Sequence, residues 1–227
     1  MISSRELPGL KNGSQLNRSA ESEILDGSGV PELDAARAYE ELQRTHDWLG
    51  NTSVILRRLR CDPIPVHSVL DIGCAHGALL QQVRRKLGAQ VVGFDLRPAP
   101  ANAQVTILKG NAVTDSLPCA DVALAICMAH HLSENDLIRL IRNVSLSCRR
   151  LILLDLVRHW LPLALFRVLV YPLLGSLNAQ DGITSLHRSF TPRELRRIVG
   201  TALEGSTAKV KYSVAPCYIR QIVDISW

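Results

Sequence analysis

Three features narrow the classes of protein to which this chain can belong: it has few aromatic residues, no closely spaced cysteine pair and no apolar run long enough to span a membrane. Phe, Trp and Tyr make up 4% of the 227 residues, which disfavours a nucleic-acid surface built on aromatic stacking. The six cysteines, none in a C-x-x-C pair, are scattered at positions 61, 74, 119, 127, 148 and 217. Their spacing indicates neither a zinc site nor a disulfide framework, so we expect reduced cysteines, no bound metal and a cytoplasmic protein.

The formal net charge of +5 does not by itself indicate a nucleic-acid partner. The basic residues are spread along the chain, for example at 57–60, 84–86 and 193–197, as on solvated helix faces. A nucleic-acid surface would combine a continuous basic stripe with aromatic residues. We therefore expect no nucleic-acid partner.

The beginning of the chain is rich in Ser, Gly, Asn and charged residues and lacks a continuous apolar stretch. This composition predicts a flexible tail over residues 1–30 rather than a signal peptide. Residues 31–227 fit a single domain, with leading helices expected over 31–64. A break between these helices is expected at Gly50 and Asn51.

The most informative stretch joins an apolar strand, residues 69–72, to a helix through a turn of small residues. Apolar residues recur at helical spacing over 79–87. Gly73 and Gly77 let the backbone of the turn approach a ligand at the N-terminus of that helix. The turn lacks a complete G-x-G-x-x-G pattern, and Asp71 before it suits a ligand with an ammonium or sulfonium group better than a phosphate.

This stretch, Asp71-x-Gly73-x-Ala75-x-Gly77, resembles the first motif of the class I methyltransferases that use S-adenosylmethionine. The usual glycine at the middle position is Ala75 here. The resemblance implies a Rossmann-like fold in which the motif holds the cofactor, S-adenosylmethionine. The same small residues also fit a degenerate dinucleotide turn, which leaves an NAD-dependent oxidoreductase as an alternative.

Three later segments follow in the order that the resemblance implies. A second strand ends in Asp95, where a βαβ unit brings an acid to ribose hydroxyls, and a third leads to Asn111 and Ala112, similar to the segment that meets the adenine amino group. The fourth strand and the residues after it resemble methyltransferase type 11, the small-molecule type related to quinone-biosynthesis and polyketide-associated enzymes. The resemblance assigns cofactor binding to Asp71, Gly73, Cys74, Ala75, Gly77, Asp95, Leu96, Asn111, Ala112 and Met128.

Strands and helices alternate after the first motif, which predicts a doubly wound α/β fold with a mostly parallel seven-stranded sheet. Ser133 and Thr191 are expected to cap two of the helices. A buried fifth strand is expected at 151–156. Strands at 209–214 and 218–225 would then form the closing antiparallel hairpin that the resemblance implies.

Residues 158–190 form a helical insertion after the fifth strand, expected on the acceptor side. Its apolar part, residues 160–174, is shorter than the roughly 20 residues of a spanning helix and contains Arg167. We expect either helices that roof an apolar pocket or, equally, a buried packing helix; transient contact with a membrane surface is the third alternative. Residues 181–190 (D-G-x-x-S-x-x-R-x-F) are predicted as a polar acceptor-side loop, similar to one in bacterial methyltransferases of polyketide or quinone-like products.

Methyl transfer from a sulfonium requires the protein to align acceptor and sulfur and to exclude water. A general base assists when the acceptor is a phenol or alcohol, and His suits that task at neutral pH. His130 and His131 follow the fourth strand at the carboxyl edge of the sheet, where open α/β folds bind ligands. His187 and His159 are further candidates for the base, whereas His76 is expected to face solvent.

We therefore predict an S-adenosylmethionine-dependent methyltransferase that acts on a small, lipophilic, hydroxylated acceptor such as a phenol, quinol or polyketide-like compound, with O-methylation favoured. No Asn/Asp-Pro-Pro-aromatic segment follows the fourth strand, which disfavours methylation of exocyclic base amines. An NAD-dependent oxidoreductase and a catalytically inactive methyltransferase-like binding protein are the alternatives. Ala75 and Asn111, the departures from the usual pattern, keep the second alternative open.

Overall fold

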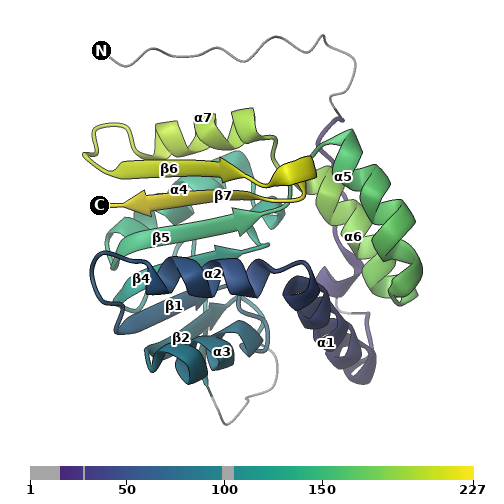
Figure 1. Cartoon of the computed structure of the whole chain (residues 1–227), viewed down its shortest axis with the longest axis horizontal. Coiled ribbons are helices and arrows are strands. Elements are labelled where there is room, and N and C mark those ends of the chain that lie inside the picture. Colours follow the sequence, from purple (N-terminus) through teal and green to yellow (C-terminus); the bar gives the residue numbers. More distant parts are fainter. Residues whose placement is uncertain (1–15, 28, 99–104) are drawn as a thin grey trace.

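The computed structural model describes residues 16–27, 29–98 and 105–227, which form a three-layer α/β structure (Figure 1). Its strands are β1 (Ser68–Ile72), β2 (Gln90–Asp95), β3 (Thr106–Lys109), β4 (Ala120–Ile126), β5 (Cys148–Asp155), β6 (Lys209–Val214) and β7 (Gln221–Ser226). They form one sheet in the order β3-β2-β1-β4-β5-β7-β6. β1 to β5 pair in parallel, and β7 pairs antiparallel with both β5 and β6. The predicted doubly wound, mostly parallel, seven-stranded sheet with its closing hairpin is confirmed.

Some of the helices cover the two faces of the sheet, and the others lie together beyond the carboxyl ends of its parallel strands. They are α1 (Glu32–Trp48), α2 (Asn51–Arg60), α3 (Ala78–Leu87), α4 (Glu134–Ser145), α5 (Trp160–Leu165), α6 (Ser176–Arg188) and α7 (Pro192–Ala202). Shorter turns are η1 (Ile24–Asp26), η2 (Ala129–His131), η3 (Phe166–Val170, a π-helix), η4 (Tyr171–Leu173) and η5 (Pro216–Tyr218). The expected break between α1 and α2 lies at Gly50, which has a φ of +76°.

Two apolar cores lie on opposite faces of the sheet because β4 and β5 are buried on both sides. On one face, α2 and α3 contribute buried side chains such as Ile55 and Leu80. On the other face, α4 and α7 contribute Leu140 and Ile198, among others (Figure 1). Both of these helices begin as predicted, since the side chains of Ser133 and Thr191 accept hydrogen bonds from backbone N–H groups in the first turn.

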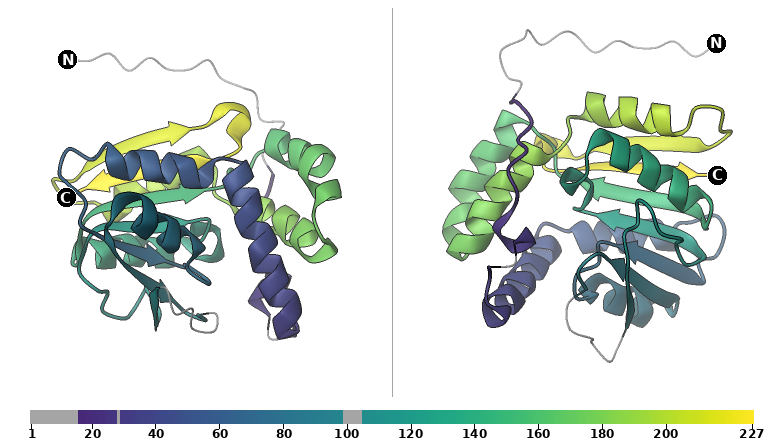
Figure 2. Two further views of the ribbon diagram at one scale, coloured as in Figure 1. Left: turned by 60° about the horizontal axis from the view of Figure 1, so that its bottom comes forward. Right: turned by 180° about the vertical axis from the view of Figure 1, so that it is seen from behind.

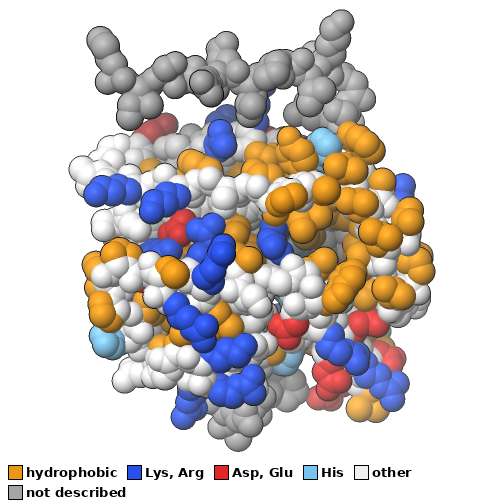
Figure 3. Space-filling model, in the orientation of Figure 1, with side chains coloured by type: hydrophobic (Ala, Val, Ile, Leu, Met, Phe, Trp, Pro, Cys, Tyr) orange, Lys and Arg blue, Asp and Glu red, His pale blue; other side chains and the backbone are white. Residues whose placement is uncertain are grey.

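The insertion after β5 is helical and stands with α1 beyond the carboxyl ends of the parallel strands (Figure 2). Exposed apolar side chains gather over the α5 and α6 side of the molecule (Figure 3). They include Trp160, Val168, Leu169, Tyr171 and Leu173. No helix in the ranges that the structure describes is long and apolar enough to cross a membrane.

The prediction of a loop over residues 181–190 is wrong, because residues 181–188 lie within α6. Gly182 and the polar residues around it suggested a turn. Instead, the glycine lets α6 approach η3 closely: a Cβ at Gly182 would lie 2.2 Å from the ring of Phe166. The polar side chains of this helix serve the chain's own N-terminal segment.

That segment, residues 16–27, packs along α6 (Figure 2). The backbone N–H groups of Ile24 and Leu25 donate to the two carboxylate oxygens of Asp181, at 2.7 and 2.9 Å. Arg158 also donates to the carbonyl of Leu16. Part of the expected flexible tail is therefore held by specific hydrogen bonds; residues 1–15 and 28 of that tail lie outside the described residues.

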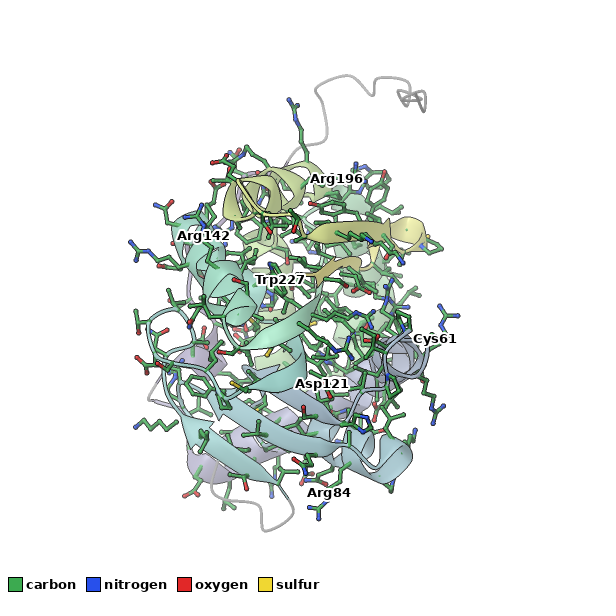
Figure 4. The ribbon with its side chains drawn as sticks, turned by 90° about the vertical axis from the view of Figure 1, so that its left-hand side faces the viewer. Cys61, Arg84, Asp121, Arg142, Arg196 and Trp227 are labelled. Carbon is green, nitrogen blue, oxygen red and sulfur yellow. The ribbon has the colours of Figure 1, made fainter. Side chains whose placement is uncertain are left out.

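The edge of the sheet opposite the insertion carries Cys61, Asp121 and Trp227 (Figure 4). Near this edge a buried ion pair joins β5 to β7: Arg150 donates through two nitrogens to the two oxygens of Asp224, at 2.7 and 2.5 Å. Arg150 is 9% exposed and Asp224 is 6% exposed. Water therefore has little access to the pair and would solvate either charged group poorly if the other were removed.

Asp224→Ala should lower the free energy of unfolding by about 3 to 5 kcal/mol, because it removes the bidentate partner of the buried Arg150 guanidinium and leaves Asp62, at 2.7 Å, as its remaining carboxylate. Arg139→Ala, which removes an exposed Arg139–Asp136 pair, should leave stability nearly unchanged. Urea unfolding of both variants measures the difference. Equal effects of the two substitutions would contradict a stabilising role for the buried pair.

Candidate active site

A cavity of about 650 Å³ opens at the carboxyl ends of the parallel strands, where β1, β2 and β4 meet the insertion and the N-terminal segment. It is lined by nine of the ten residues predicted to bind a cofactor: Asp71, Gly73, Cys74, Ala75, Asp95, Leu96, Asn111, Ala112 and Met128. Residues from four separate segments of the sequence are thus brought to one side of one cavity. Ligands of open α/β folds bind at this edge of the sheet.

The loop after β1 is held against the end of β2. The backbone N–H of Gly73 donates to the carbonyl of Phe94 at 2.9 Å, and that of Ala75 donates to Asp95 Oδ2 at 2.8 Å. Gly73 has a φ of +72° and Ala75 a φ of +49°, both in the left-handed region. A side chain in this region costs roughly 1–2 kcal/mol, which explains why glycine is usual where this chain has Ala75.

Gly77 lies behind the cavity, at the N-cap of α3, with a φ of +75°. A Cβ at this position would lie 2.7 Å from Val105 Cγ2. Gly77 therefore permits both the backbone turn and the close approach of Val105, the residue before β3. Its contribution to a cofactor site is indirect.

Asp71 is buried at the end of β1, 4% exposed. Burial, and then the negative charge of Asp95, raise the pKa of the Asp71 carboxyl to about 8. A positively charged group in the cavity would stabilise the ionised form and reverse part of this shift. The arrangement suits a cationic ligand, as the sequence suggested.

Asp95 presents its carboxylate at the junction of the first two loops. Its Oδ1 accepts the backbone N–H of Arg97 and its Oδ2 accepts that of Ala75, both at 2.8 Å. A carboxylate has about four acceptor positions, so both oxygens retain capacity for ligand hydroxyls. The neighbouring Leu96 is exposed and lines the same part of the cavity.

The remaining predicted cofactor residues complete this half of the cavity. Asn111 Oδ1 already accepts the backbone N–H of Val113 at 3.0 Å and retains one lone pair. Met128 lies against Gly73, where a Cβ would come within 3.0 Å of Met128 Cβ. Burial raises the pKa of the Cys74 thiol, so this side chain acts as a packed neutral group.

His76 does not simply face solvent, as the sequence suggested, but is half-buried beside the ring of Tyr39. Its ring centroid lies 5.9 Å from that of Tyr39, and both residues line the cavity. Its Nδ1 is buried and has no hydrogen-bond partner among the described residues.

His130 is buried, 2% exposed, and both of its ring nitrogens face carboxylates. Nδ1 lies 2.7 Å from Asp155 Oδ1, and Nε2 lies 3.2 Å from Glu23 Oε1. Burial alone would lower the pKa of His130, but the charge and hydrogen bonds of Asp155 and Glu23 outweigh it and raise the pKa to about 10. His130 is therefore an imidazolium at neutral pH when only protons occupy the cluster.

His131 is the more exposed of the two histidines, with 29% of its side chain accessible. Its Nδ1 lies 2.9 Å from Asp26 Oδ2 and its Nε2 lies 3.7 Å from Glu23 Oε2. The guanidinium of Arg188 donates to the backbone carbonyls of both histidines and lies 3.6 Å from Asp26. Both histidines line the cavity.

The other two candidate bases lie elsewhere. His187, on α6, does not line the cavity, and its backbone carbonyl accepts the N–H of Ser19. His159 caps α5 by accepting the N–H of Leu161, and its ring stacks on Tyr218 with centroids 4.5 Å apart. Neither side chain lines the cavity.

The sequence did not identify three carboxylates of the site: Glu23, Asp26 and Asp155. Asp155 ends a buried strand, as Asp95 ends β2, and its position at the carboxyl edge of the sheet was a usable signal. Glu23 and Asp26 lie in a polar segment whose composition predicted a tail. No local pattern in that segment indicates that it reaches the histidines.

The wall of the cavity away from the first motif is mostly apolar. It is formed by Leu42, Trp48, Leu132, Leu156, Pro162, Leu165, Phe166, Leu169, Val170, Leu174 and Ile219. α1 and the insertion supply most of these side chains, so the predicted roof over an apolar pocket is observed. The histidine cluster also lines this cavity.

Comparison with known proteins agrees with these features. Residues 69–150 match the family model described as a methyltransferase domain. No curated protein matches the chain. The matched range contains the loop after β1, the acid that ends β2, and both histidines of the cluster.

Several solved structures share the fold. The plantazolicin methyltransferase BpumL, in complex with a monoazolic desmethylPZN analog and SAH, is 14% identical with a TM-score of 0.68, over 85% of this chain and 90% of that one. Human N-acetylserotonin methyltransferase in complex with SAM is 15% identical with a TM-score of 0.60, over 89% and 61%. A putative O-methyltransferase from Nostoc punctiforme is 16% identical with a TM-score of 0.60, over 93% and 64%.

At these identities the likeness to solved structures shows the fold alone. The family match identifies residues 69–150 as a methyltransferase domain. The order of the motifs along the chain indicates S-adenosylmethionine as the cofactor. A methyltransferase is thus indicated rather than an NAD-dependent oxidoreductase. Residues 69–150 thus carry a methyltransferase domain, in a chain that shares the fold of solved methyltransferases.

Proposed function

We propose that this enzyme transfers the methyl group of S-adenosylmethionine to a hydroxyl group of a small, lipophilic acceptor of the phenol, quinol or polyketide-like class. One observation carries the proposal: a single cavity has the methyltransferase motifs on one side, an apolar helical roof on the other, and two histidines in its lining. Cofactor and acceptor could therefore be enclosed together, away from water. Enclosure and alignment supply much of the acceleration of such a displacement.

The cofactor is assigned to the half formed by the loops after β1, β2 and β3. Asp95 would accept the ribose hydroxyls, and the remaining lone pair of Asn111 Oδ1 would accept the adenine amino group. Asp71 would offset the positive charge of the methionine portion. Each assignment rests on the position of that side chain in the cavity wall.

The acceptor is assigned to the apolar half, which fits a ring or chain with few polar groups. One similar solved structure is a plantazolicin methyltransferase and another is an N-acetylserotonin methyltransferase, so the fold alone does not select the acceptor. The acceptor hydroxyl would meet His131 rather than His130, because His130 is already protonated below about pH 10 and cannot accept a proton at neutral pH. The exposed apolar residues of the insertion support contact with a membrane surface, from which a lipophilic acceptor would be delivered.

A screen of phenols and quinols with S-adenosylmethionine, read out as S-adenosylhomocysteine formed, tests the proposal. At least one hydroxylated apolar acceptor should be methylated on oxygen, and His131→Ala should lower kcat by about 10²–10⁴-fold, the usual contribution of a general base. His187→Ala should have little effect because its side chain lies outside the cavity. Methylation at nitrogen or carbon only, or equal loss in both variants, would contradict the proposal.

The two glycines at the ends of α3 provide a matched test of the cofactor loop. Gly77 and Gly88 have φ values of +75° and +68°, but only a Cβ at Gly77 meets a neighbour within 4 Å. Both alanine variants should lose about 1–2 kcal/mol of stability from the left-handed backbone. Only Gly77→Ala should also weaken S-adenosylhomocysteine binding, by at least about 10-fold (1.4 kcal/mol), as measured by calorimetry. Equal binding by the two variants would show that close packing behind the loop does not matter.

Asp71→Asn should stabilise the cofactor-free enzyme while weakening cofactor binding. Because the folded-state pKa of Asp71 is raised to about 8, its contribution to stability is present below about pH 4 and is lost as the pH rises to about 8. The increase in Tm caused by Asp71→Asn should therefore grow between pH 5 and pH 8 and then level off. A pH-independent difference in Tm would contradict the raised pKa.

A further inference from the structure

Two histidines and a glutamate lie together at the cavity. A general base needs only one imidazole, so the arrangement of all three side chains calls for another explanation. Nε2 of His130 and Nε2 of His131 face the two oxygens of Glu23, at 3.2 and 3.7 Å. One ligand-type atom from each of the three residues lies within 4.8 Å of the other two. All three residues line the cavity.

The opposite nitrogens of the two rings are held by a second pair of carboxylates. His130 Nδ1 lies 2.7 Å from Asp155 Oδ1, and His131 Nδ1 lies 2.9 Å from Asp26 Oδ2. Such contacts fix the orientation of each ring and leave Nε2 available. A histidine that binds a metal ion nearly always has a carboxylate, carbonyl or water on its other ring nitrogen.

The charge of the cluster also favours a cation. Glu23, Asp26 and Asp155 place three carboxylates around two imidazoles, and the two arginines among the described residues that approach them, Arg97 at 3.1 Å and Arg188 at 3.6 Å, both pair with Asp26. Asp155 is 1% exposed, so solvent does little to stabilise its charge. A divalent ion between the Nε2 atoms and Glu23 would replace the protons that otherwise separate these groups.

We propose that Glu23, His130 and His131 bind a divalent transition-metal ion. Two imidazoles and one carboxylate suit Zn²⁺, Fe²⁺ or Ni²⁺, whereas Mg²⁺ prefers oxygen ligands and retains its water. Three protein ligands leave coordination positions open. Binding of the ion follows from the cluster itself, whereas its use rests on the proposed function. With the ion bound, both ring nitrogens of His131 are engaged, so the ion would activate the acceptor oxygen, and His131 would serve as the general base only in the metal-free enzyme.

The ion would also fix the N-terminal segment over the cavity. Glu23 reaches the histidines because Asp181 accepts the N–H groups of Ile24 and Leu25, and because the Ser185 hydroxyl donates to Glu23 at 2.7 Å. These two α6 residues belong to the polar motif that was predicted as an acceptor-side loop. Their observed role is to position a ligand of the proposed metal site.

Calorimetric titration of the chelator-treated full chain with Zn²⁺, and separately with Mg²⁺, tests the proposal. The chain should bind one equivalent of Zn²⁺ and bind Mg²⁺ far more weakly. Glu23→Gln should weaken Zn²⁺ binding by at least about 10-fold, the lower end of the 10–100-fold effect of removing even an outer partner. Glu21→Gln changes an exposed glutamate of the same segment and should bind Zn²⁺ as the unmodified chain does.

Binding of S-adenosylhomocysteine by the same samples serves as the control for folding, and Glu23→Gln should retain it. Absence of saturable Zn²⁺ binding would overturn the proposal and leave the cluster as hydrogen-bonded imidazolium and carboxylate. Zn²⁺ binding that survives in Glu23→Gln but is lost on alkylation of the exposed Cys61, Cys119 and Cys217 would also overturn it. Zn²⁺ binding without methylation of any hydroxylated acceptor would instead count against the proposed function alone.

Discussion

The parallel pairing of β1 with β2 on one side and β4 on the other is the constraint on which the site depends. Ile72 lies opposite Phe94 and Ala125 in the two ladders. The three following segments therefore leave the sheet at the same level, which brings Gly73, Asp95 and Met128 to one cavity. A shift of register by one residue would turn the strand residues before these segments to the other face of the sheet.

The site concentrates ionisable groups that are unfavourable without a partner. Asp71 is buried next to Asp95, and three carboxylates surround two histidines at the other side of the same cavity. Such groups lower the stability of the unliganded protein unless opposite charge compensates them. A sulfonium cofactor would compensate the first group, and protons or a divalent ion the second. The stability of the chain is thus coupled to what occupies the cavity.

Local patterns predicted the sheet and the cofactor half of the site, but not the elements that reach it from a distance. The strand periodicity and the small residues around Gly73 are consequences of nearby sequence. The position of Glu23 depends instead on contacts with α6, formed by residues such as Asp181 that are remote in sequence. Composition predicted a tail for the N-terminal segment and a loop for residues 181–190. Local sequence cannot distinguish polar residues that hydrogen-bond to each other across the fold from polar residues that face solvent.

We propose that the cavity beside β1 and β2 holds S-adenosylmethionine. Isothermal titration of the full chain with S-adenosylhomocysteine, alongside Asp95→Ala, tests it most directly. One saturable site per chain, weakened at least about 10-fold by loss of the carboxylate (1.4 kcal/mol), is the result that this arrangement predicts. Absence of saturable binding, or binding unchanged in Asp95→Ala, would contradict it.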